Sequence, residues 1–176
     1  MFFDKRAVIA MHAQELEAWE GLLAGLSIAQ ITTPSLPNGW SVKDTVAHLA
    51  AWQQRTVARL EAALDDRAPR FPRWPVELGD EESDEAVDRA NAWLLETNRD
   101  RLWPDVHGAW REGYLRFLEL LRAVPESEMR ADGKVPWVAE YELLDGQAGS
   151  YDYHHARHRG TLEAWIREHA RAAQPR

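Results

Sequence analysis

The chain has 176 residues, a formal net charge of −8 at pH 7 and no cysteine, so we expect one domain over 1–176 with a core of its own. The missing thiol excludes disulfides, C-x-x-C redox motifs, thiolate metal sites and a cysteine nucleophile. Because the charge is acidic, and no basic stripe, signal core or run of about 18 apolar residues is present, we expect a cytoplasmic protein that binds neither nucleic acid nor membranes.

The first predicted helix covers about residues 4–26. Asp4 is a good N-cap, and apolar residues follow it at alternating spacings of three and four. One position of this apolar stripe is His12, which we interpret as a core histidine. Residues 32–39 contain two prolines and an Asn-Gly pair, and therefore end the helical pattern.

The second predicted helix begins at Ser41, where Ser41-x-x-Asp44 resembles a capping box with aspartate in place of the usual glutamate. A proline-rich loop is expected at 67–83, after the helix has ended. Its predicted buried face consists of Val42, Val46, Leu49, Trp52, Leu60 and Leu64.

Three further helical segments are predicted. A short one covers 84–98, and a longer one begins near Pro104 and ends before Pro125. After an irregular stretch at 125–138, the last helix should begin near 141–145 and run to about residue 170. Strand alternation and internal repeats are absent. The sequence therefore predicts an all-α fold, a four-helix bundle with a short extra helical segment.

Three histidines have the spacing of a metal site. His154 and His158 lie four apart on the last predicted helix, which places both on one face with Cβ atoms about 5–6 Å apart. His48 lies on the second helix, one turn before Trp52. Burying histidine costs desolvation unless each ring finds a partner, and a metal ion satisfies several rings at once. We therefore predict that His48, His154 and His158 bind one divalent metal.

Two alternatives remain open from the spacing. His155 points about 100° away from its neighbour His154. At a spacing of three from His158, His155 could take the place of His154 as the second ligand on this helix. The apolar stripe does not decide between them, because Tyr151 is three residues before one and four before the other. The histidines could also simply pack in a bundle without a site.

The predicted chemistry follows from the ligands. Three neutral imidazoles leave the charge of the ion uncancelled, which suits hydrolysis, or transfer of a low-molecular-weight thiol supplied as a second substrate, to a small electrophile. Zinc or nickel is the metal we expect first, although imidazole also suits iron and manganese. Because small-molecule sites are mostly aromatic and apolar, we expect Trp40, Trp52 and Tyr151 to line the substrate site. Nucleophile-elbow, phosphate-loop and H-E-x-x-H motifs are absent.

The segments that carry these histidines resemble a known family. Residues 39–52, with Gly-Trp-Ser-Val-Lys-Asp followed by His-Leu-Ala-Ala-Trp, are similar to the second helix of the DinB-like superfamily. His154-x-x-x-His158-Arg159-Gly160 resembles its late H-x-x-x-H-x-G motif. Residues 91–101, with a following helix that ends at Pro125, look like the ClbS/DfsB branch, which includes a colibactin self-resistance protein.

The resemblance implies an up-down-down-up bundle that is often dimeric, with metal ligands at His48, His154 and His158. Characterised members include metal-dependent transferases that use low-molecular-weight thiols, and maleylpyruvate isomerases. Thr161 stands where many relatives have glutamine, and the ClbS/DfsB branch does not uniformly keep the ligands. The chain thus resembles either a metal-dependent enzyme or, alternatively, a small-molecule binding or self-resistance protein that works without a metal. We expect a homodimer in both cases.

Overall fold

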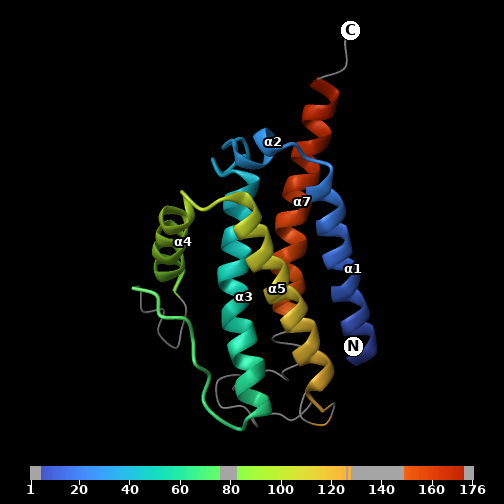
Figure 1. Cartoon of the computed structure of the whole chain (residues 1–176), viewed down its shortest axis with the longest axis vertical. Helices are drawn as coiled ribbons and strands as arrows, with labels where there is room; N and C mark the ends of the chain where they lie inside the picture. Colours follow the sequence, from blue (N-terminus) through green and yellow to red (C-terminus); the bar gives the residue numbers. More distant parts are fainter. Residues whose placement is uncertain (1–4, 76–82, 126, 128–148, 173–176) are drawn as a thin grey trace.

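The regular structure of the chain is helical in all the parts that the computed structural model describes, which are residues 5–75, 83–125, 127 and 149–172 (Figure 1). The predicted all-α class is confirmed for these residues. None of their helices is long and apolar enough to cross a membrane. The helices are α1 (Lys5–Ala24), α2 (Ile28–Thr32), α3 (Val42–Leu64), α4 (Asp84–Asn98), α5 (Trp103–Ala123) and α7 (Gly149–Ala172).

The four long helices surround a common core. Helix α3 packs against α5, α5 against α1, α1 against α7, and α7 against α3. Figure 1 shows α1 and α7 running in one direction and α3 and α5 in the other. Helix α4 packs on the outer side of α3, and the short α2 contacts α3 and α5. The largest fully buried side chains of this core are Trp19, Leu49, Leu60, Trp110, Tyr114, Phe117, Leu121 and Leu162.

The predicted capping box starts α3. The backbone N–H of Asp44 donates to Oγ of Ser41 at 3.1 Å, and the carboxylate of Asp44 accepts from the N–H of Ser41 at 2.9 Å. Both otherwise unpaired donors are satisfied, and the first turn of the helix is fixed. His48 follows one turn later, so this cap also fixes the direction in which His48 leaves the helix.

Helices α3 and α5 pack closely at Gly113. A Cβ atom on Gly113 of α5 would lie only 2.8 Å from Nε2 of Gln53 on α3. The buried Gln53 donates from that Nε2 to the carbonyl oxygen of Trp110 at 3.3 Å. The absent side chain thus allows α3 to lie against α5.

The structure corrects two expectations about helix ends. The first helix ends at Ala24, and a separate helix, α2, follows under its own capping box between Ser27 and Gln30. Leu64 was placed on the buried face but is 39% exposed, because it is the last residue of α3. The proposed cap Asp4, residues 126 and 128–138 of the irregular stretch, and the expected start of the last helix lie outside the described residues.

Candidate metal centre

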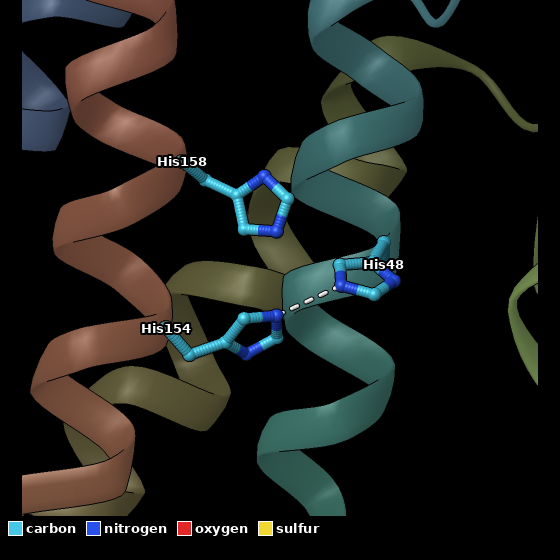
Figure 2. Close-up of side chains that lie close together, drawn as sticks. All are labelled: His48, His154 and His158. Atoms are coloured by element: carbon cyan, nitrogen blue, oxygen red, sulfur yellow. Dashed lines mark hydrogen bonds between the residues drawn. The ribbon is translucent and has the colours of Figure 1, made fainter. Parts of the chain in front are cut away.

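His48 of α3 faces His154 and His158 of α7 across the bundle (Figure 2). One ring nitrogen from each of the three lies within 4.8 Å of the other two. The Nε2 atoms of His48 and His154 are 2.9 Å apart, and the three ring centroids are separated by 4.9, 5.0 and 5.2 Å. Within the described ranges, this is the one group of three or more potential metal ligands.

His155 points to a different part of the bundle. Its side chain is buried, and its ring stands edge-on to Tyr114 of α5, with centroids 5.2 Å apart. A step of one residue turns the side chain by about 100°, which carries it from the α3 side of α7 into the core. The structure therefore gathers the pair spaced by four, His154 and His158, with His48. The predicted core histidine His12 is likewise buried, edge-on to Phe117 at 4.9 Å.

The three clustered rings are neutral at pH 7. Burial, reinforced by the neighbouring His154 and His158, lowers the pKa of His48 from its usual 6.5 to about 2. Burial followed by the charges of His158 and Arg157 lowers the pKa of His154 to about 4, and burial followed by Arg157 does the same for His158. A neutral imidazole keeps one nitrogen lone pair, which is the form that binds a metal.

The donor set fits a divalent ion. With metal–nitrogen bonds of about 2.0–2.1 Å, two ligand nitrogens stand roughly 2.9 Å apart at a right angle and about 3.4 Å apart at a tetrahedral angle. The Nε2 atoms of His48 and His154 are 2.9 Å apart, which is the separation expected for a right angle. The third nitrogen, from His158, is within 4.8 Å of both. To close a three-nitrogen site, the His158 nitrogen has to come within about 3.4 Å of the other two.

Tryptophans border the histidine cluster. The half-buried Trp40 and Trp52 both lie next to His48, with their ring centroids 5.2 and 6.2 Å from the centroid of its imidazole. Both were candidates for the apolar wall. Trp74 and Trp93, which sequence reasoning did not select, extend this group: Trp52 is 5.2 Å from Trp74, which is 6.4 Å from Trp93. The side chain of the third candidate, Tyr151, lies outside the described residues.

An ion pair holds the ligand-bearing helix α7 against α1. Arg159, adjacent to His158, donates from Nε to the buried carboxylate of Glu15 at 2.8 Å and also pairs with Glu163 one turn further along α7. Because Arg159 and His158 leave the helix in different directions, this contact orients α7 while leaving the histidine toward α3. Spacing alone did not reveal this contact.

Comparison with known proteins gives one result. The sequence model described as the DinB superfamily matches residues 11–162, which include all three clustered histidines. No curated protein and no solved structure matched the chain.

Proposed function

Because the chain belongs to the DinB superfamily, we propose that it is a divalent-metal-dependent enzyme acting on a small electrophilic molecule. Members of this superfamily often bind metal. The observation that carries the proposal is the convergence of three neutral imidazoles, His48, His154 and His158, from two helices. We propose zinc or nickel as the ion, since imidazole suits both.

The residues of the chain would bind the ion and keep water away from the substrate. His48, His154 and His158 contribute neutral nitrogen ligands, so the ion keeps its full charge. Once bound, it would polarise a substrate oxygen or lower the pKa of a water or thiol toward neutrality. Trp40 and Trp52 provide apolar surface beside His48, where a small molecule can be held with little water. The reaction is hydrolysis, or transfer of a low-molecular-weight thiol, which a second substrate must bring because the chain has no cysteine.

Further parts of the proposal concern the relationship and the assembly. The directions of α1, α3, α5 and α7 support the up-down-down-up four-helix bundle of the superfamily. The pattern of residues 91–101 supports a place in the ClbS/DfsB branch. We also propose a homodimer, supported by exposed apolar side chains such as Ile28 and Leu102, at 61% and 68%.

A second candidate function is a metal-free small-molecule binding or self-resistance protein. Its support is the group of half-buried tryptophans, Trp40, Trp52, Trp74 and Trp93, which is a large aromatic surface independent of any ion. Under this alternative, chelation of metal would leave ligand binding unchanged.

One experiment separates the two candidates. Untagged protein, freed of metal and then reloaded with zinc or nickel, is assayed on a panel of chromogenic esters and thiol-reactive electrophiles, with and without a low-molecular-weight thiol. The enzyme proposal predicts turnover that requires the metal, is lost in His48→Ala and is kept in His169→Ala. His169 is a matched control because it is an exposed histidine on the same helix, α7. Equal turnover with and without metal would contradict the enzyme proposal.

A further inference from the structure

The half-buried Asn91 of α4 has a side-chain orientation that its neighbour determines. The indole Nε1 of Trp52 donates to Oδ1 of Asn91 at 2.9 Å. An indole N–H can only donate, so the amide atom that faces it must be the carbonyl oxygen and not the NH₂ group. A carbonyl oxygen has two lone pairs, and Trp52 uses one of them.

His48 presents its second ring nitrogen on the opposite side from the metal site. Figure 2 shows its Nε2 directed at His154 and its other nitrogen pointing away from both His154 and His158. This Nδ1 is buried and has no hydrogen-bond partner among the described residues. The interaction of Asn91 with His48 raises the pKa of His48, against the larger effect of burial, as an oxygen near a ring N–H would.

We propose that Asn91 is a positioning residue that accepts the Nδ1–H of His48 and so keeps the lone pair of Nε2 directed at the metal site. His48 and Trp52 are four residues apart on α3, so both donors lie on one face, and one carbonyl oxygen of α4 serves both. Histidines that bind metal almost always donate their other ring N–H to an oxygen, which fixes the tautomer and the ring. The role of Asn91 in metal binding rests on the proposed function; the tautomer of His48 does not.

The tautomer is tested first, in the metal-free protein, by nitrogen-15 NMR of the histidine rings. The 2.9 Å contact between the two Nε2 atoms needs one donor and one acceptor. The inference predicts a protonated Nδ1 and an unprotonated Nε2 in His48, with His154 donating from Nε2. Asn91→Leu should give a mixture of His48 tautomers. A proton on Nε2 of His48 in the wild-type protein would overturn the inference.

Zinc affinity, measured by competition with a chromophoric chelator, is the second readout. Asn91→Leu should lose about 10–100-fold in affinity, the usual effect of removing the oxygen partner of a ligating histidine. Asn91→Asp keeps an acceptor oxygen and should stay within about threefold of wild type or bind more tightly. The control is Asn98→Ala, which removes another α4 asparagine whose amide donates within its own helix to Leu94, and it should leave both the tautomer and the affinity unchanged.

The outcomes distinguish this inference from the proposed function. Affinity of Asn91→Leu equal to wild type, or an equal loss in Asn98→Ala, would overturn the role of Asn91 while leaving the metal site standing. If the wild-type protein binds no zinc, nickel or manganese, the proposed function fails. The nitrogen-15 measurement on wild type and Asn91→Leu then decides by itself whether Asn91 sets the tautomer of His48.

Discussion

Among adjacent residues on α7, replacing His155 should reduce stability more than replacing His154, whereas replacing His154 should reduce metal binding more than replacing His155. His154 is half-buried, and one of its nitrogens belongs to the histidine cluster. His155 is 1% exposed and packs edge-on against Tyr114. The structure therefore places the first residue in the group that could hold a metal ion and the second in the packed core.

The expected magnitudes follow from these positions. His155→Ala empties a buried volume and should lower the free energy of unfolding of the metal-free protein by about 2–4 kcal/mol, as for other large-to-small core changes. His154→Ala removes a less buried ring and should cost about 1 kcal/mol or less. In zinc affinity the order reverses, because loss of one of three ligands should cost at least about 100-fold, or roughly 2.7 kcal/mol. His155→Ala should keep the affinity of wild type within about threefold.

Denaturant unfolding of the metal-free variants gives the first quantity, and zinc competition in the native buffer gives the second. If His155→Ala loses zinc and His154→Ala keeps it, the ligand assignment is wrong by one residue. If both variants lose stability equally and neither changes zinc affinity, the histidines only pack.

Three other results are expected. The pKa values of the three clustered histidines lie below 6.5 in the folded protein, at about 2 to 4, so the unfolded chain binds protons first as the pH falls. The contribution of these histidines to the stability of the metal-free protein should therefore be level above about pH 6.5 and fall toward pH 4. Urea unfolding that shows no such fall would contradict the lowered pKa values. Gly113→Ala should destabilise the protein by about 1–3 kcal/mol in thermal unfolding, because its Cβ would meet Gln53 at 2.8 Å. The control Gly108→Ala, with open space around it, should stabilise the protein by about 0.4–1 kcal/mol. Equal effects of the two changes would argue against the close approach of α3 and α5. Light scattering at micromolar concentration should give a dimer mass, and a monomer mass would count against the proposed assembly.

Features set by neighbours in sequence could be predicted. The Ser41–Asp44 cap and the length of α3 follow from local hydrogen bonding and apolar spacing, and the structure has both. Helix α2 was missed although Ser27-x-x-Gln30 is a capping box in the sequence, because five residues are too few to show a helical period.

Features that depend on packing between helices could not be predicted. Spacing on α7 allowed either His154 or His155 to accompany His158, and only the placement of α3 and α5 on different sides of α7 separates them. The contact of Asn91 with Trp52 likewise requires α4 to lie on α3, and no local pattern specifies that docking. The predicted ligands came together with Trp40 and Trp52 beside them, whereas Trp74, Asn91 and the Arg159–Glu15 pair emerged only from the fold.

The central claim, that His48, His154 and His158 hold one divalent ion, is tested most directly by calorimetric titration of metal-free, untagged protein with zinc and with nickel. We expect one ion per chain for wild type and for His169→Ala, and no saturable binding for His48→Ala, whose far-ultraviolet circular dichroism should remain helical. No binding to the wild-type protein, or equal binding to His48→Ala, would contradict it.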